Sequence, residues 1–433
     1  MASIPPPSFA VPQPPAAPRR KKVPWWVWLI VAVVVGCGGT SVLLSAWVLA
    51  PLVATKSDAQ LRREFTRLKI PAKLAEVDAH IKGGHDLREL DAVWDQNKPK
   101  LLGESVSVDD RRGAETRLLN TMRELAERHD AADFGAFAAL DPGEISDRMF
   151  DLQVDVPRLI ERGVTTITEG DRAAGRRDVL AGVEWMTWLH QSHYPGAHIA
   201  LAESLERSIN SLIHVLDARL LIGADRTRLE ALLSRLERPL NWLAAVEAEP
   251  VVTLEVLYSS DSESTERSLS RGVVTTKLGR ITRVRDYVKS KPNDLLGLAD
   301  ELRKVPAGSM VTGGITGGLA ELISNQTQDL VEAEPRRQAL LAVLRAGLYM
   351  EAERTRTGQF PTSLPADFLV DDPFRPGQAL QYRFDSANEA FVWSVGPDRT
   401  DNQGRSFWDL PEAEQDAARD PFDRKPDPGD YVY

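Results

Sequence analysis

One stretch near the N-terminus constrains this chain more than any other. From Trp25 to Val53, 29 consecutive residues carry no charge. A membrane-spanning helix needs about 20 apolar residues, so the stretch is long enough to cross a bilayer. Trp25 and Trp26 lie at its start and Trp47 lies toward its end, as expected for side chains that anchor in the two membrane interfaces. The sequence predicts a single transmembrane helix over residues 25–53.

This apolar stretch has two alternative interpretations, a cleaved signal peptide and a lipoprotein signal. A cleaved signal peptide has an apolar core of about 7–15 residues, which is shorter than this one. Residues 34–37, Val-Val-Gly-Cys, resemble a lipobox, so a lipoprotein anchored at Cys37 is an alternative. A lipidated cysteine is normally followed by a polar tether, whereas here the apolar run continues to Val53. The length of the run favours an uncleaved anchor.

The residues before the span predict its orientation. Residues 1–24 are rich in proline and end in a basic cluster from Arg19 to Lys22. This composition is typical of a disordered tail. Four basic residues beside a span favour a cytoplasmic location for the tail. Basic residues also follow the span, but long domains are translocated despite such charges, so we expect the bulk of the chain outside the cytoplasm.

Composition excludes several classes of protein. The chain of 433 residues has a net charge of -10, so it lacks the overall basic charge typical of a nucleic-acid-binding protein. One cysteine excludes an intrachain disulfide and a cysteine-based zinc site. Hydrophobic residues make up 42% of the chain, which indicates that most of it folds.

Residues 54–335 are predicted to form a helical domain. Leucines and other apolar residues recur there at spacings of three and four, which is typical of amphipathic helices packed in an antiparallel bundle. The clearest stripes are Leu118, Leu119, Met122 and Leu125; Leu201, Leu205, Ile209, Leu212, Leu216 and Leu220; and Leu229, Leu232, Leu233 and Leu236, with Asp225 as a candidate cap. Residues 251–258 fit either a strand or a buried helical end.

Candidate catalytic residues in this region are few. His190, His193 and His198 lie within nine residues of one another, but Pro195-Gly196 interrupts a helix between them and no acid lies in the run. Ordinary loop histidines are therefore favoured over a metal site. If the chain is an enzyme, these three histidines are its candidates.

Other motifs are weaker still. The glycine-rich segment 312–318 lacks the Gly-Lys-Ser/Thr of a nucleotide-binding loop. The adjacent acids Asp109-Asp110 and Asp371-Asp372 are typical of solvated surface, because a glycosidase needs carboxylates on opposite sides of a cleft. The sequence therefore assigns no catalytic residue, and we expect no enzymatic activity.

Residues 336–433 show a more specific pattern. Pro335 is expected in the first turn of a helix that ends near Thr357-Gly358. Two strands are expected at 380–384 and 390–395, because apolar and aromatic residues alternate there. A turn-rich acidic loop follows at 396–404.

This order resembles the C-terminal domain of the major pseudopilin of bacterial type II secretion systems. The matching pieces are Thr-Gly-x-Phe-Pro-x-Ser-Leu at 357–364, Asp-Pro-Phe at 372–374, Tyr-x-Phe at 382–384, and Ser-Val-Gly-x-Asp at 394–398 with Asp401. The resemblance covers under a quarter of the chain. It implies a small α+β module with a short antiparallel sheet.

The resemblance also implies a calcium site. It implies side-chain ligands at Asp398 and Asp401 and a carbonyl from Ser394 or Val395, with Asp409 available to complete the shell. Calcium takes six to eight oxygen ligands, which such a loop can supply. The chain departs from the family because its span ends about 280 residues before the module and contains no glutamate. Filament assembly by the family's route is therefore not implied.

Taken together, the sequence predicts a mainly α protein with a small α+β module at its C-terminus. We expect a single-pass protein of the bacterial inner (cytoplasmic) membrane, with a non-catalytic binding or scaffolding role in the envelope. The resemblance implies a secretion-related role, which would require a protein partner in the envelope. An enzyme with a site in the helical domain and a lipoprotein anchored at Cys37 are the alternatives.

Overall fold

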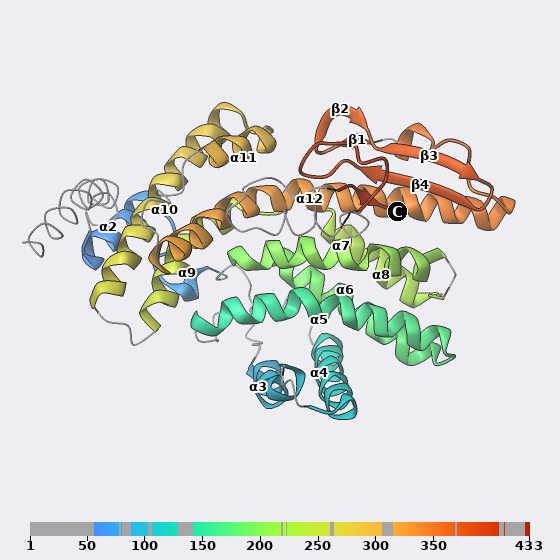
Figure 1. Cartoon of the computed structure of the whole chain (residues 1–433), viewed down its shortest axis with the longest axis horizontal. Coiled ribbons are helices and arrows are strands. Elements are labelled where there is room, and N and C mark those ends of the chain that lie inside the picture. The colour runs from blue at the N-terminus through green and yellow to red at the C-terminus, as the bar shows by residue number, and fades with distance from the viewer. Residues whose placement is uncertain are drawn as a thin grey trace, which may run out of the picture. The chain divides into compact units, whose positions relative to one another are not determined.

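The computed structural model describes residues 56–77, 79, 88–102, 106–128, 142–217, 220–221, 223–259, 264–304, 315–368, 370–406, 411 and 429–433. The predicted tail, the predicted span and Cys37 lie outside these residues. No helix of the described part is both long and apolar enough to cross a bilayer. The described part is mainly α: eleven α-helices pack together, and two small antiparallel sheets follow near the C-terminus (Figure 1).

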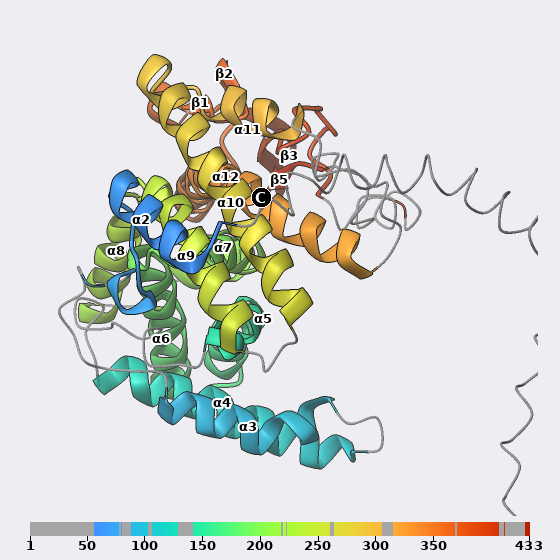
Figure 2. The same ribbon diagram turned by 90° about the vertical axis from the view of Figure 1, so that its left-hand side faces the viewer.

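The helices have the following bounds. They are α2 (Asp58–Leu68), α3 (Arg88–Leu102), α4 (Val108–Arg128), α5 (Pro142–Thr168), α6 (Arg172–Gln191), α7 (Pro195–Asp217), α8 (Ala224–Leu236), α9 (Trp242–Ser259), α10 (Ser264–Ser290), α11 (Leu295–Lys304) and α12 (Ile315–Thr357). Short 3₁₀ helices occur at η1 (Leu74–Glu76) and η4 (Ala366–Phe368). The helices α3 and α4 run as a pair along one edge of this region (Figure 2).

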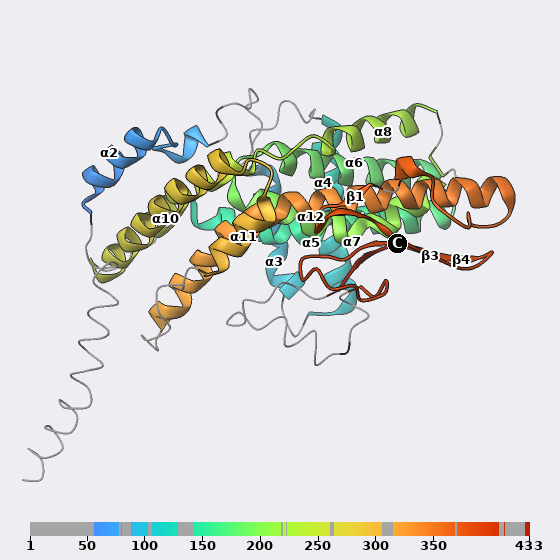
Figure 3. The same ribbon diagram turned by 90° about the horizontal axis from the view of Figure 1, so that it is seen from above.

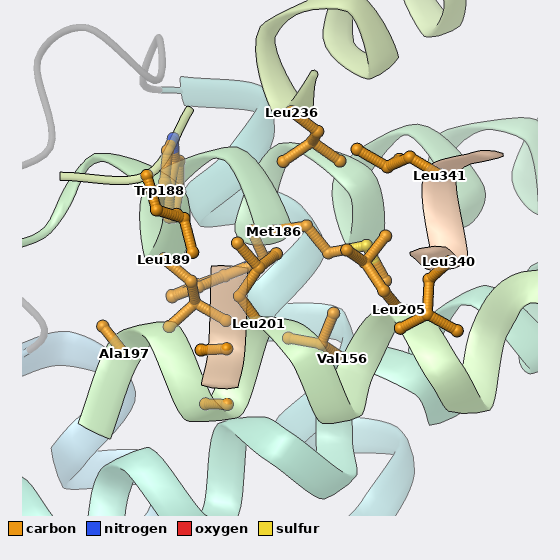
Figure 4. Packing of buried hydrophobic residues seen from close by; sticks show 14 of the residues in the cluster. Val156, Met186, Trp188, Leu189, Ala197, Leu201, Leu205, Leu236, Leu340 and Leu341 are labelled. Atoms are coloured by element: carbon orange, nitrogen blue, oxygen red, sulfur yellow. The ribbon is translucent and has the colours of Figure 1, made fainter. Parts of the chain in front are cut away.

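The predicted apolar stripes form the core. The leucines at 118, 119, 125, 201, 205, 212, 229, 232, 233 and 236, with Met122 and Ile209, are buried as expected. Figure 4 shows Met186 and Leu189 of α6 meeting Leu201 and Leu205 of α7, with Leu236 and Leu340 of α8 and α12 beside them. Burying each such side chain contributes roughly 1.5–3 kcal/mol, so these stripes supply most of the driving force for packing.

Three local details differ from or refine the sequence interpretation. Residues 251–258 belong to α9, so the helical alternative is the right one. Leu220 lies after the end of α7, so the stripe stops earlier than predicted. Asp225 does not cap α8: Gly223 occupies the N-cap position, and Asp225 in the first turn pairs instead with Arg176 of α6 at 3.1 Å.

The helices α5 and α6 approach closely through glycines. A Cβ atom on Gly163 would lie 2.7 Å from the Gly175 carbonyl oxygen and 2.9 Å from the Val179 nitrogen. A Cβ atom on Gly175 would lie 2.8 Å from the Ile167 nitrogen. Real side chains do not reach such distances, so glycine is required at both positions.

A charged group is buried where α9, α10 and α12 meet. Lys277 donates to one carboxylate oxygen of Glu249 at 2.5 Å, and Thr327 donates to the other at 2.5 Å. The side chains of Lys277 and Glu249 are each 2% exposed. Burial lowers the pKa of Lys277, and the adjacent carboxylate opposes that shift. An unpaired buried charge is costly, so the Lys277–Glu249 pair favours the relative position of α9 and α10 in which the two side chains meet. The bond from Thr327 extends this constraint to α12.

The longest helix joins the helical region to the C-terminal sheet. The helix α12 contacts α7, α9 and α11, and further along it contacts β4 and β5. It runs through Pro335, so the prediction that a helix begins at this proline is wrong. Its end is as predicted, since Gly358 follows Thr357 with φ of 82°, a conformation that glycine adopts readily.

Two antiparallel sheets follow α12 in the chain, and the second contacts α12 through β4 and β5. The first joins β1 (Asp371–Asp372) to β2 (Arg375–Ala379), and the second has the order β3 (Gln381–Ser386), β4 (Glu389–Ser394) and β5 (Tyr431–Val432). Tyr382 faces Val392 across the β3–β4 pair, which confirms the predicted hairpin. The β1–β2 pair and β5 were not predicted. Figure 3 shows the second sheet running along the C-terminal part of α12.

Candidate functional site

The acidic loop after β4 is anchored at its base by a buried aspartate. Asp372 is 1% exposed. Its Oδ1 accepts hydrogen bonds from the Phe374 N–H at 2.9 Å and the Ser394 hydroxyl at 2.8 Å, and its Oδ2 accepts from the Val395 N–H at 3.0 Å. The two predicted carbonyl donors, Ser394 and Val395, are therefore held in place by a carboxylate from β1.

The two predicted side-chain ligands organise the loop itself. Asp398 Oδ1 accepts from the Thr400 N–H at 2.9 Å, which is the hydrogen bond of an Asx turn. Asp401 Oδ1 accepts from Trp393 Nε1 at 3.1 Å and from the Gln403 N–H at 2.8 Å. All three of these bonds end on an Oδ1 atom, of Asp398 in the first case and of Asp401 in the other two.

A third acid reaches the loop from the end of the chain. Asp430, which precedes β5, is 2% exposed. Its Oδ1 accepts from the Asn402 N–H at 3.2 Å, and its Oδ2 accepts from the Gly404 N–H at 2.8 Å. The sequence interpretation missed this residue, because Asp430 lies far along the chain from the loop that it contacts.

The surroundings of Asp430 and Asp398 are unfavourable to the charged forms of these two acids. Burial, together with the nearby charges of Asp401 and Asp398, raises the pKa of Asp430 to about 6, against the hydrogen bonds from the Asn402 and Gly404 N–H groups. Burial also raises the pKa of Asp398, against the hydrogen bonds from Thr400 and Asn402. A cation bound beside these carboxylates would favour their ionised forms.

The donor chemistry of the loop fits calcium better than a transition metal. The three acids supply oxygen only, and oxygen is what calcium prefers. However, among the described residues no group of three or more His, Cys, Asp or Glu side chains is placed to hold a metal ion. Asp409 lies outside those residues. Asp398 and Asp401 share the loop that Asp430 contacts, but their described arrangement is that of a hydrogen-bonded turn.

The loop is tied to the helical region by one arginine. Arg399 adopts φ of 57°, an unusual value for a residue other than glycine. Its Nη1 lies 3.0 Å from Asp300 Oδ2 of α11, and its Nη2 donates to the Leu296 carbonyl at 3.4 Å. A change in the loop conformation would therefore act directly on α11.

The predicted histidine cluster serves as a set of packing contacts. His190 Nε2 lies 2.8 Å from the Arg238 carbonyl oxygen, and His193 Nε2 lies 3.1 Å from Asn241 Nδ2. Both partners belong to the turn between α8 and α9. Burial lowers the pKa of His190, which keeps its ring neutral near pH 7. The two rings thus hold that turn against the end of α6.

His198 is separated from solvent. It is 0% exposed, and its Nε2 lies 2.8 Å from the Ser192 carbonyl oxygen. Burial lowers its pKa to about 3. A group that stays neutral and inaccessible cannot exchange protons with a substrate, so the arrangement does not support a general base at this position. The predicted break lies between α6, which ends at Gln191, and α7, which begins at Pro195. Only His193 lies in it, so the prediction of loop histidines is wrong for His190 and His198, which belong to the two helices.

The remaining motifs also have structural roles. Asp110 lies in the first turn of α4, where its N–H donates to Ser107 Oγ at 3.1 Å. Residues 312–314 of the glycine-rich segment lie outside the described part. Residues 315–318 form the start of α12.

A groove lies where α12 meets the turn after α8 and the 3₁₀ helix η4. Its volume is about 440 Å³, and Leu341, Phe368 and Val370 form its apolar part. At its edge, Arg345 Nε donates to Glu237 Oε1 at 2.7 Å. Val370 is 40% exposed. The groove can accept an apolar side chain of a partner, with charged groups at its rim.

Comparison of the chain with protein-family models, curated proteins and solved structures finds no match. The resemblance to the major pseudopilin therefore rests on the order of sequence pieces alone.

Proposed function

We propose that this chain is a membrane-anchored protein of the bacterial envelope that binds or scaffolds a protein partner and has no catalytic activity. The observation that carries the proposal is α12, which is shared by the helical region and the C-terminal sheet. A single helix that packs against both parts couples them mechanically. Such an arrangement suits a rigid support for a partner. The three candidate histidines are engaged in packing contacts.

Several observations support parts of this proposal. The charge-free run at 25–53 supports the anchor. The order of a long helix followed by an antiparallel sheet agrees with the pseudopilin-like module, including the predicted β3–β4 pair. A secretion-related role is an analogy from this resemblance, because a fold does not by itself fix a function.

The groove beside α12 is the proposed partner contact. We expect a membrane-embedded envelope protein to be captured by crosslinking the full-length chain in its native membrane. Val370→Asp places a charge in the apolar part of the groove and should remove the captured protein. Val108→Asp is the matched control, because Val108 is 72% exposed at the start of α4 and does not line the groove. Capture that is equal in the two variants would contradict the assignment of the groove.

Calcium is the proposed ligand of the acidic loop. Asp398, Asp401 and Asp430 would hold it, and the ion would supply positive charge that neutralises their repulsion. Extracellular calcium sites have dissociation constants of about 0.1–1 mM. Calcium at ten times such a value should stabilise the folded chain by about 1.4 kcal/mol.

Thermal unfolding of the full-length chain in detergent tests the calcium site. We expect calcium, but not the same concentration of magnesium, to raise the melting temperature, and Asp398→Asn to remove the effect. Asp385→Asn is the control, since Asp385 is an acid of the β3–β4 hairpin that pairs with Arg383 at 2.9 Å. A calcium response that survives in Asp398→Asn would refute the site.

A further inference from the structure

The first helix after the predicted span carries a basic surface. Residues 56–73 contain six Lys or Arg and two Asp or Glu, although the whole chain has a net charge of -10. The helix α2 buries Leu61 and Phe65, and exposes Arg63 and Arg67 on its opposite side. Positive charge is therefore concentrated on one short element of an acidic protein.

Part of this charge has no counter-charge in the described structure. Within the described residues, the side chains of Arg63, Lys69 and Lys73 make no ion pair and no hydrogen bond, and all three are exposed. Arg67 pairs only with Glu64 on its own helix, at 2.6 Å, and its side chain is 67% exposed. Arg63, Arg67, Lys69 and Lys73 are named here the α2 basic patch.

The backbone places one of these cations at a conformational cost. Lys69 ends α2 with φ of 55°, a conformation in which helices usually carry glycine. A side chain other than that of glycine is disfavoured in this conformation. The turn that follows is held against α2, because Arg62 Nη1 donates to the Ala72 carbonyl at 3.0 Å. This bond ties the residue before Lys73 to α2.

The helix is firmly attached to the rest of the protein. Arg271 Nε donates to Asp58 Oδ1 at 2.8 Å at one end of α2, and Arg285 Nη1 donates to the Leu68 carbonyl at 2.6 Å at the other. In Figures 1 and 3, α2 accordingly lies alongside α10. A ligand that binds the α2 basic patch is therefore connected to the helical region through the hydrogen bonds between α2 and α10.

The position of α2 in the chain identifies its partner. Four residues, 54–57, separate the end of the predicted span from α2, and they reach at most about 14 Å when extended. The start of α2 is thus confined close to the bilayer surface. Lys and Arg near an anionic surface each contribute about fivefold to binding, and this attraction falls off within a Debye length.

We infer that the α2 basic patch lies on the headgroups of anionic phospholipids in the membrane that anchors the chain. This inference rests on the membrane anchor of the proposed function. The inference also predicts the orientation of the helical region relative to the membrane. The helix α2 lies along the bilayer surface, and its contacts with α10 hold the helical region at a fixed angle to that surface. The contact is electrostatic, so it depends on lipid charge and on salt.

Lysine acetylation of the full-length chain in lipid nanodiscs tests the contact. One set of discs contains phosphatidylcholine alone and the other an equal mixture with phosphatidylglycerol. Mass spectrometry gives the acetylation of Lys69 and Lys73 relative to Lys289, whose side chain is 79% exposed. We expect this ratio to fall about fivefold or more in the anionic discs and to recover in molar salt, where the Debye length is about 3 Å.

Paired variants separate the patch from general surface charge. Arg63→Gln with Arg67→Gln should restore the ratio in anionic discs. Arg226→Gln with Arg356→Gln should leave it low, because these two arginines are also exposed but belong to α8 and α12. A ratio that is equal in the two lipids, or unchanged by Arg63→Gln with Arg67→Gln, would overturn the inference.

Co-elution of the chain with the discs tests the membrane anchor separately. A chain that does not co-elute with the discs refutes both the anchor and the lipid contact. A chain that co-elutes but shows the same acetylation ratio in both lipids refutes the lipid contact alone.

Discussion

Replacing Gly163 by alanine should destabilise the protein, although alanine is the better helix former. The added Cβ would lie 2.7 Å from the Gly175 carbonyl oxygen, 0.7 Å short of the 3.4 Å at which ordinary contact begins. Both nearby polar atoms belong to the backbone of α6, so they cannot rotate away. The two helices must separate, and a gap of 0.5–1 Å forfeits roughly a quarter to a half of the dispersion energy at each contact.

The expected magnitude follows from two opposing effects. Overpacking of this kind costs about 1–3 kcal/mol, and the change from glycine to alanine within a helix recovers about 1 kcal/mol. A net loss of up to about 2 kcal/mol should lower the melting temperature of a folded region of this size by up to about 3 °C. Gly279→Ala in α10 is the control, because a Cβ there meets nothing within 4 Å and should raise stability. The reasoning is refuted if thermal unfolding in detergent shows Gly163→Ala to be as stable as Gly279→Ala.

Two further predictions concern buried charges. Lys277→Met should cost about 3–5 kcal/mol, because it leaves Glu249 buried without its cation, whereas Lys277→Met with Glu249→Leu should restore most of the loss; equal melting temperatures for the single and double variants would contradict this. The pKa of Asp430 is raised in the folded state from its usual value of 3.8 to about 6, so its stabilising contribution is present below about pH 4 and is lost as the pH rises to about 6. The stability of Asp430→Asn relative to the wild type, measured in chelator, should therefore rise by about 1–3 kcal/mol between pH 4 and pH 7, because solvent screens part of the shift. A difference that does not change with pH would exclude the effect.

The elements that depend on local pattern were predictable from the sequence. The stripe of Leu229, Leu232, Leu233 and Leu236 has helical spacing, and all four side chains are buried in α8. The alternation around Tyr382 and Val392 likewise gave the β3–β4 hairpin. In both cases the period of apolar residues reflects which face meets the core, so no knowledge of distant contacts was needed.

Features that depend on distant partners were not predictable. From the sequence alone, Gly163 and Gly175 would be expected to destabilise their helices. The structure shows that the backbones of α5 and α6 are in close contact at these two glycines. The acidic loop was located correctly, but Asp430 reaches it from β5, which consists of two residues and leaves no periodic signal. Asp372 was expected on the solvated surface as part of an adjacent acid pair. That prediction is wrong, because Asp372 is buried and accepts hydrogen bonds from Ser394 and Val395.

The course of α12 shows how tertiary packing overrides a local signal. Proline in the interior of a helix destabilises it by about 3 kcal/mol, so the first turn of a helix is the most favourable position for Pro335. The structure continues the helix on both sides of it, with Leu330 and Val331 before the proline and Ala339 and Leu340 after it all buried. Burial of four such side chains contributes more than the proline costs. The C-terminal sheet is consequently built on a helix whose earlier turns belong to the core, so removal of residues before 336 would expose the face of α12 that α7, α9 and α11 cover.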